Sequence, residues 1–240
     1  KDLGSIEEMK ERIRDYLGKI FEANYNDRIY QLALQKGWLV EFLKEPNDFR
    51  LVASLGTAVR YFEDSKSSQK KVAVLEYSDF QCPFCARFHI QTLPSILEEY
   101  VDQGKVKLIF RDFPIQNIHP NALPASVAAE CANEQDKFKE MHDELFDNQK
   151  KWSGLETANA MLLFSQYALE TGLEQEIFDS CLTSGKYIEE IRNDLNDGRN
   201  YGVSGTPGFF IGNDQVGYVE LKGAQPFESF KKVIDAQLNT

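Results

Sequence analysis

The sequence predicts an α/β fold with a mixed central sheet, a long helical insertion and a helical extension at the N-terminus. Three observations lead to this fold class. Residues 72–75 form an apolar run with the length and valine content of a buried strand, and a helical pattern follows it. A second strand-like run at 106–110 comes after that helix, and this order predicts parallel pairing. Strand character returns at 209–221 around the tight turn Gly212-Asn213-Asp214.

The composition is that of a globular protein with an acidic surface. The chain has 240 residues, a formal net charge of −11 and four cysteines. The negative charge argues against nucleic acid as a partner, and no apolar stretch is long enough to span a membrane. The chain starts at Lys1 in a polar stretch with no visible signal peptide, and we expect a processed protein.

Residues 1–65 are expected to form a helical N-terminal extension. Ser5 and Glu8 have the spacing of a capping box, and apolar residues then recur at helical spacing. Further helices are expected, the last at about 49–62, followed by a polar linker at 64–70. This extension cannot close a large core alone. Two uses stay open, a cap folded on the same chain or a dimerisation surface.

The stretch that carries chemistry is Cys82-Pro83-Phe84-Cys85, where the first strand gives way to a helix. The first N–H groups of a helix are unpaired and its dipole is positive there, so a thiol at that end ionises more easily. Cys82 is therefore predicted to be the exposed nucleophile. Cys85, one turn in, would be the shielded thiol that attacks a mixed disulfide on Cys82. Pro83 fits the first turn because its missing N–H costs nothing.

A Cys-x-x-Cys pair can also be half of a zinc site, which would need a second such pair or nearby histidines. Cys131 and Cys181 are far apart in sequence, and no histidine falls at ligand spacing. His89 is expected on the helix surface, His119 near a helix start, and His142 packed on a helix face. We therefore predict redox chemistry at the Cys-x-x-Cys pair, with no metal and no cofactor.

The later chain is expected to hold a helical insertion over 113–200 and the second half of the core over 201–240. Gly205-Thr206-Pro207-Gly208 precedes the strand at 209–211, and Pro226 opens a final helix. Apolar positions at helical spacing in the insertion include Met161, Leu162, Phe164, Tyr167, Leu169, Ile177, Phe178 and Leu182.

The motif and the order of elements together resemble the DsbA-like thiol–disulfide oxidoreductases of the thioredoxin superfamily. The resemblance covers about residues 70–240 and leaves the N-terminal extension outside. It implies a thioredoxin fold whose first half is 70–112, with the insertion at 113–200 and the second half at 201–240. Similar proteins with an extra helical N-terminus include dimeric or trimeric isomerases and oxidases.

The resemblance assigns roles residue by residue. Cys82 matches the attacking cysteine and Cys85 the resolving one. Pro207, preceded by Thr206, matches the family's cis-proline, which lies beside the active-site disulfide. The backbone of Thr206 would then pair with an unfolded substrate as an added strand. In isolation, Thr206-Pro207 would be interpreted as an ordinary turn.

Glu76 lies in the first predicted strand, where a carboxylate is out of place. It matches the family's buried acid beneath the resolving cysteine. Burial would raise its pKa and let it exchange a proton with Cys85. The alternative is a surface charge on a solvent-facing strand position.

Phe84 departs from the pattern of the strongly oxidising members, which carry His at this position. Phe offers neither a hydrogen bond nor a charge to the thiolate. We expect the helix terminus to lower the pKa of Cys82, but less than in those members, which gives a less oxidising disulfide. Thr206 before the proline is also more similar to isomerases than to the strongest oxidases.

Cys131 and Cys181 fall in the predicted insertion, where some relatives have a second disulfide. The resemblance implies that these two cysteines are bonded to each other. In the chain-entropy model a loop of this size stabilises the fold by about 4 kcal/mol. The alternative is two separate buried thiols.

The resemblance predicts an extracytoplasmic enzyme that introduces or reshuffles disulfides in folding proteins. The oxidase form would be reoxidised by a quinone-linked membrane partner of the DsbB or VKOR kind. The isomerase form, similar to DsbC or DsbG, would keep Cys82 reduced and would gain from a homodimer. A non-enzymatic chaperone or adhesion module on the same fold, and a glutathione-linked transferase, are the alternatives from other classes.

Overall fold

The computed structural model describes residues 60–61, 72–213 and 217–239. They lie in the second of the two units into which the chain divides, residues 50–240. The expected helices before residue 60, their capping box and the linker lie outside the described residues. No helix within the described ranges has the length and apolar character needed to cross a membrane.

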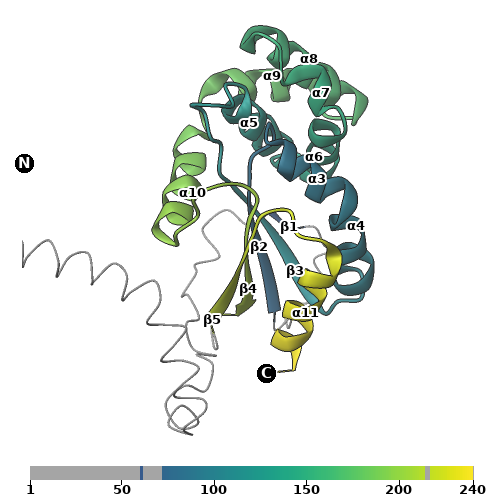
Figure 1. The fold of residues 1–240 in the computed structure, drawn as a ribbon. Helices are drawn as coiled ribbons and strands as arrows, with labels where there is room; N and C mark the ends of the chain where they lie inside the picture. Colours follow the sequence, from purple (N-terminus) through teal and green to yellow (C-terminus); the bar gives the residue numbers. More distant parts are fainter. Residues whose placement is uncertain (1–59, 62–71, 214–216, 240) are drawn as a thin grey trace, which may run out of the picture. The chain divides into compact units, whose positions relative to one another are not determined.

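A five-stranded mixed sheet forms the centre of the described part of the chain (Figure 1). Strand β2 pairs in parallel with β3 and antiparallel with β4, and β4 in turn pairs antiparallel with β5. The mixed sheet predicted from the sequence is confirmed. In chain order the strands are β1 (Arg60–Tyr61), β2 (Val72–Ser78), β3 (Val106–Asp112), β4 (Gly208–Asn213) and β5 (Gly217–Lys222).

The prediction of a helix at about 49–62 is wrong at Arg60 and Tyr61. These two residues form the short edge strand β1. They pair antiparallel with Phe110 and Ile109 of β3. Without β1, the backbone N–H and C=O groups at the outer edge of β3 would have no strand partner, and β1 pairs with them. A helical pattern in the local sequence carries no information about this distant edge.

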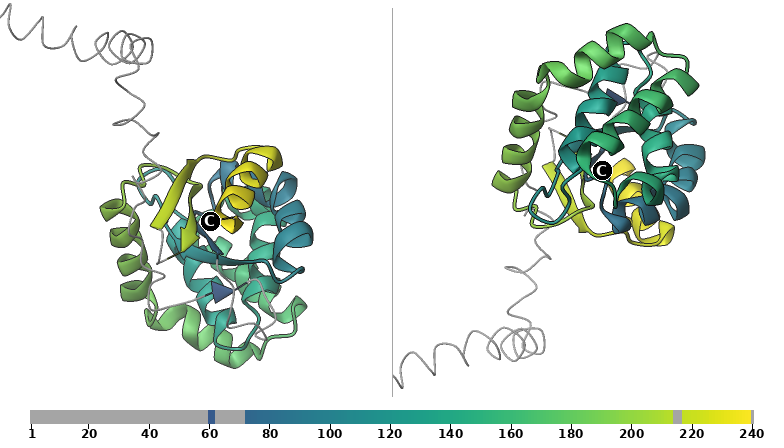
Figure 2. Two further views of the ribbon diagram at one scale, coloured as in Figure 1. Left: turned by 90° about the horizontal axis from the view of Figure 1, so that it is seen from below. Right: turned by 90° about the horizontal axis from the view of Figure 1, so that it is seen from above.

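The alternation along β2 decides which side chains face which layer. Val72 and Val74 belong to the larger core cluster, under α3 and α11, whereas Ala73, Leu75 and Tyr77 belong to the smaller one, under α10. Successive side chains of a strand point to opposite faces, so Glu76 shares the face of Val74. Figures 1 and 2 show these layers, with α10 on one face of the sheet and α3, α4 and α11 on the other. The helices and helical turn of these layers are α3 (Pro83–Gln91), α4 (Leu93–Ile96), the π-helical turn η1 (Leu97–Val101), α10 (Ile188–Asn200) and α11 (Phe227–Leu238).

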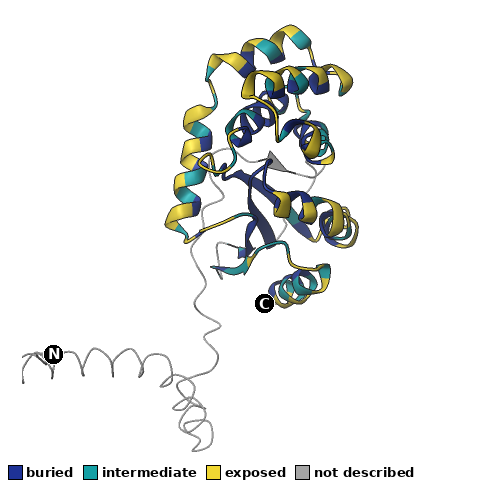
Figure 3. Ribbon diagram, turned by 45° about the horizontal axis from the view of Figure 1, so that its top comes forward, coloured by how far each residue is buried: buried dark blue, intermediate teal, exposed yellow. Residues whose placement is uncertain are grey.

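The helical segment between β3 and β4 packs beyond the sheet, where buried residues line its inner side (Figure 3). Trp152 is fully buried and meets the Phe164 ring at 5.2 Å between centroids. Its helices before α10 are α5 (Ala122–Asn133), α6 (Phe138–Asp147), α7 (Gln149–Trp152), α8 (Thr157–Glu170) and α9 (Gln175–Ser184).

Some apolar positions expected on buried helix faces are exposed. Leu162 is 70% exposed, although it lies two residues from the buried Phe164. At 3.6 residues per turn a step of two turns the side chain to the opposite side of the helix. Leu169 and Ile177, also predicted to be apolar contacts, are exposed as well.

A buried ion pair attaches α10 to the sheet. Arg111 of β3 donates from Nε to Asp194 Oδ1 at 2.8 Å, and its side chain is 1% exposed. The backbone N–H of Asp112 donates to Asp194 Oδ2 at 3.1 Å. Gly198 on the same helix allows the close approach, because a Cβ there would come within 2.8 Å of the Phe113 ring.

Candidate active site

The turn after β2 places Cys82 at the N-terminus of α3. The N–H of Cys82 donates to the Asp79 carbonyl at 3.0 Å, and Cys82 has extended backbone angles, φ −71° and ψ 124°. The helix then begins at Pro83, a position where no N–H is needed. Gln149 of α7 fixes the turn from the other side, since its Nε2 donates to the carbonyls of Phe80 and Cys82 at 2.7 and 2.9 Å.

The cis Thr206-Pro207 peptide lies directly against Cys82. The Cys82 Sγ donates to the Thr206 carbonyl at 3.4 Å. Cys82 is only 4% exposed in the chain without substrate, so the expectation of an exposed cysteine is wrong. The cis-proline loop covers it, and because Thr206 is 124 residues away in sequence, a local pattern could not predict this contact.

The two thiols differ in ionisation. The pKa of Cys82 is lowered to about 6, chiefly because the Cys85 thiol hydrogen-bonds to its sulfur. Burial opposes this shift, while Thr206 and the backbone N–H groups of Cys85 and Phe84 add to it. The direction agrees with the sequence argument, but the helix terminus is not the largest cause. Cys85 has no exposed surface, and burial raises its pKa well above the ordinary value.

Glu76 lies beneath this pair on the strand face that α3 covers. Its side chain is 1% exposed, and burial raises its pKa to about 8. One carboxylate oxygen, Oε2, is buried without a hydrogen-bond partner. The charge of Glu76 in turn raises the pKa of Cys85, which places the two groups in electrostatic contact. Glu76 therefore carries a proton at neutral pH that it can lose when its surroundings change.

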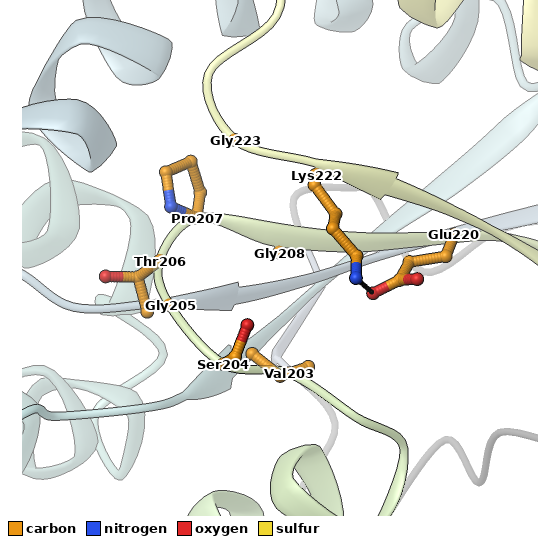
Figure 4. Close-up of a pocket in the computed structure, with 9 residues that line it drawn as sticks. All are labelled: Val203, Ser204, Gly205, Thr206, Pro207, Gly208, Glu220, Lys222 and Gly223. Carbon is orange, nitrogen blue, oxygen red and sulfur yellow. Dashed lines mark ion pairs between the residues drawn. The ribbon is translucent and has the colours of Figure 1, made fainter. Parts of the chain in front are cut away.

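A pocket of about 240 Å³ adjoins the cis-proline. Figure 4 shows Pro207 and Thr206 at one end and the Lys222–Glu220 ion pair, 3.3 Å between Nζ and Oε1, along one side. The Gly223 N–H donates to the Pro207 carbonyl at 2.9 Å and so holds the loop in place. The lining residues are Val203, Ser204, Gly205, Thr206, Pro207, Gly208, Glu220, Lys222 and Gly223.

Sequence reasoning missed the group that organises the turn before Cys82. Asp79 is fully buried, and its Oδ1 accepts the Gln81 N–H at 2.8 Å. Its Oδ2 accepts the Ile115 N–H at 2.8 Å and lies 2.8 Å from His119 Nδ1. This hydrogen bond raises the pKa of His119, and the charge of Cys82 adds a smaller increment. An aspartate just before the motif was the available signal.

The other two cysteines are joined by a disulfide. Cys131 of α5 and Cys181 of α9 have sulfurs 2.00 Å apart and Cα atoms 5.7 Å apart. Both residues lie in the helical insertion, as placed by the sequence analysis. Cys82 and Cys85 are free thiols.

The expectation for one histidine is wrong, whereas His142 is packed on a helix face as expected. His89 was expected on the helix surface, but its side chain is 12% exposed and its ring lies 5.2 Å from that of His142. The two rings come from α3 and α6, 53 positions apart, so sequence spacing does not reveal the pair. In the described part of the chain, the candidate metal ligands that cluster are His89, His142 and Asp143, and neither Cys82 nor Cys85 is among them.

Fold and site together define a protein in which an asymmetric Cys-x-x-Cys pair faces a cis-proline at the edge of a mixed sheet. Comparison with known proteins gives the same class. The thioredoxin family model matches residues 67–236. The probable disulfide bond formation protein D of Bacillus anthracis is 31% identical over 168 residues, which cover 70% of this chain and 74% of that protein.

Solved structures agree. α-DsbA1 of Wolbachia pipientis is 26% identical, with a TM-score of 0.67 over 80% of this chain and 96% of that one. BdbD of Bacillus subtilis, in its oxidised form, is 20% identical and shares the fold, with a TM-score of 0.67 over 80% of this chain and 98% of that one. The chain belongs to the thioredoxin superfamily and is a DsbA-like thiol–disulfide oxidoreductase, an enzyme that acts on protein substrates.

Proposed function

We propose that Cys82 is the sulfur that exchanges with substrate, that Cys85 resolves the mixed disulfide, and that the enzyme oxidises folding proteins outside the cytoplasm. The observation that carries this proposal is the asymmetry of the two thiols. The pKa of Cys82 is lowered to about 6 while that of the fully buried Cys85 is raised. Only Cys82 is therefore a thiolate at neutral pH, and the thiolate is both the nucleophile and the better leaving group.

The oxidising cycle moves two electrons from two substrate thiolates to the enzyme disulfide, and one proton to Cys85. A substrate thiolate attacks Cys82 Sγ of the Cys82–Cys85 disulfide, the S–S bond breaks, and Cys85 leaves as a thiolate. Cys85 then takes a proton, for which Glu76 is the adjacent donor, since its pKa of about 8 keeps it protonated at neutral pH. A second substrate thiolate attacks the substrate sulfur of the mixed disulfide and releases Cys82 as a thiolate. The substrate has gained a disulfide, and the reduced enzyme holds Cys82 as a thiolate and Cys85 as a thiol. Attack by Cys85 on the mixed disulfide resolves it in the reverse direction and returns the substrate thiolate.

Substrate binding is assigned to the surface beside Cys82. The Thr206 hydroxyl is buried without a hydrogen-bond partner, and the Thr206 carbonyl is occupied by the Cys82 thiol until that thiol ionises. Both groups can then pair with an extended chain as an added strand. Phe84, inside the motif, is 54% exposed, and Arg87 lies over its ring at 5.1 Å. An unfolded apolar segment fits such a surface.

Three finer assignments accompany this proposal. The disulfide between Cys131 and Cys181 supports an oxidising, extracytoplasmic compartment. A quinone-linked membrane partner would return the dithiol to the disulfide. A homodimer through residues 1–65 would favour the isomerase role, and the reduction potential of the Cys82–Cys85 couple separates the two roles, because an isomerase works with Cys82 reduced.

The test is oxidation of a reduced, unfolded ribonuclease by the oxidised chain, followed by the recovery of ribonuclease activity. We expect Cys82→Ser to abolish the transfer, a loss of about 10³-fold or more, because no other described sulfur has a lowered pKa. Cys85→Ser should instead trap a mixed disulfide when it is given ribonuclease that still contains disulfides, because Cys82 can attack such a bond and no Cys85 thiol is present to release it. Transfer at wild-type rate by Cys82→Ser would contradict the proposal and would favour a non-enzymatic binding role.

A further inference from the structure

A cluster of metal-ligating side chains lies at the other end of the active-site helix. His89 is four residues beyond Cys85 on α3, and it faces His142 and Asp143 of α6. One ligand atom from each of the three lies within 4.8 Å of the others. The redox mechanism uses none of them.

The tautomer of His89 is set by a carboxylate. The His89 Nε2 lies 3.1 Å from Asp147 Oδ1, and an ionised carboxylate only accepts hydrogen bonds, so Nε2 carries the proton. The Nδ1 atom is then a lone-pair donor. It is buried, has no hydrogen-bond partner, and lies 3.9 Å from Asp143 Oδ1. The lone pairs of His89 Nδ1 and Asp143 Oδ1 face each other at this separation, and a cation bound between the two atoms would stabilise this arrangement.

The other two side chains converge on the same point. The His142 side chain is 1% exposed, with Nδ1 at 2.9 Å from Asp143 Oδ1. As for His89, the proton between a nitrogen and a carboxylate lies on the nitrogen, here His142 Nδ1. A bound metal ion would take the place of this proton, since metal binding to such ligands releases protons.

We propose that His89, His142 and Asp143 bind one divalent transition-metal ion between α3 and α6, and that Zn²⁺ fits this donor set. Two imidazole nitrogens and one carboxylate oxygen are ligands that zinc accepts in a tetrahedral site with one position open to water. Asp147 would be the outer carboxylate that orients His89. Asp143 is 29% exposed and gives the ion a path from solvent, while the exposed Lys139 that pairs with it can turn away.

The site would connect two parts of the fold. His89 belongs to the helix that begins with the reactive cysteines, whereas His142 and Asp143 belong to the helical insertion. An ion that binds the native chain and not the unfolded one stabilises the native chain by mass action. Zinc would therefore resist separation of the insertion from the active-site helix. This inference does not depend on the direction of electron flow at Cys82.

The experiment is calorimetric titration of the full chain, without an affinity tag, with ZnCl₂. The chain is kept in its oxidised form, so that the Cys82–Cys85 thiols cannot bind zinc. We expect one ion per chain for the wild type and at least about tenfold weaker binding for His89→Gln. The matched control, His119→Gln, also removes one histidine and should bind like the wild type. A tetrahedral Co²⁺ spectrum that His89→Gln loses would report the same ligand set.

The proposal is overturned if the oxidised wild type takes up no stoichiometric zinc, or if His89→Gln binds it as tightly as the wild type. Circular dichroism establishes that the variant is folded. If His89→Gln does not fold, Asp143→Asn takes its place, since Asp143 is partly exposed. Undiminished binding by the folded Asp143→Asn chain would equally overturn the proposal.

Discussion

The chain has two cysteine pairs, and their surroundings give them opposite chemistry. Cys82 and Cys85 lie at a helix N-terminus against a cis-proline, where one thiol has a lowered pKa and the other a raised one. Cys131 and Cys181 join α5 to α9 within the helical insertion, with no thiol left to ionise. The comparison teaches that reactivity follows from thiolate stabilisation beside an approachable backbone, whereas a disulfide that bridges two helices serves to hold them together.

Removing the insertion disulfide should give the largest change in stability. The bridge closes a loop of 50 residues, so the chain-entropy model predicts a loss of about 4 kcal/mol for Cys131→Ala with Cys181→Ala. Denaturant unfolding measures it. We expect disulfide transfer to stay near the wild-type rate at a temperature where the variant is folded. Loss of transfer there would show that the insertion disulfide also supports the reactive pair.

Glu76→Gln should increase stability at alkaline pH. The carboxyl pKa is about 8 in the folded chain against an ordinary value of 4.5, so the folded state holds its proton more tightly. The unfolded state loses that proton above pH 4.5 while the native state keeps it. The free energy of unfolding therefore decreases as the pH rises to about 8. The variant removes this decrease, which reaches several kcal/mol at pH 9, and nothing below pH 4. Unfolding of the oxidised chains at the two pH values measures it.

The same variant has a functional readout. If Glu76 supplies the proton to Cys85, Glu76→Gln should slow the transfer step without changing the pKa of Cys82 by more than a few tenths. If Glu76→Gln changed stability equally at pH 4 and pH 9, the raised pKa of Glu76 would be contradicted. An unchanged transfer rate would contradict its role as the proton donor to Cys85.

Phe84→His should make the reactive pair more oxidising. An imidazole between the cysteines offers a hydrogen bond and a charge to the Cys82 thiolate, which the Phe ring does not. We expect the pKa of Cys82 to fall from about 6 by about one unit, which corresponds to about 30 mV in reduction potential. Thiolate absorbance against pH gives the pKa, and equilibrium with glutathione gives the potential. Phe84→Leu is the control and should leave both near the wild-type values.

His119→Gln should have the smallest effect on the same thiol. The Cys82 charge contributes to the raised pKa of His119, and by reciprocity a protonated His119 lowers the pKa of Cys82. The contribution is a minor one, so a rise of a few tenths of a unit is expected in the absorbance titration. A rise of two units would make His119, and not the neighbouring Cys85 thiol, the main stabiliser of the thiolate.

The sequence by itself determined the mixed sheet, the strand-to-helix position of the cysteines, and the out-of-place carboxylate at Glu76. These features follow from local patterns, such as the apolar run of the first strand and the apolar residues at helical spacing that follow it. It also pointed correctly to a family in which the element order and the motif occur together.

Only the tertiary structure decided the features that depend on residues distant in sequence. The cover over Cys82 comes from Thr206, the anchor of the preceding turn pairs Asp79 with His119, and His89 meets His142 across two helices. The edge strand at Arg60–Tyr61 needed the free edge of β3 to form. Burial and long-range hydrogen bonds set these pKa values and exposures, and a local pattern contains no information about either.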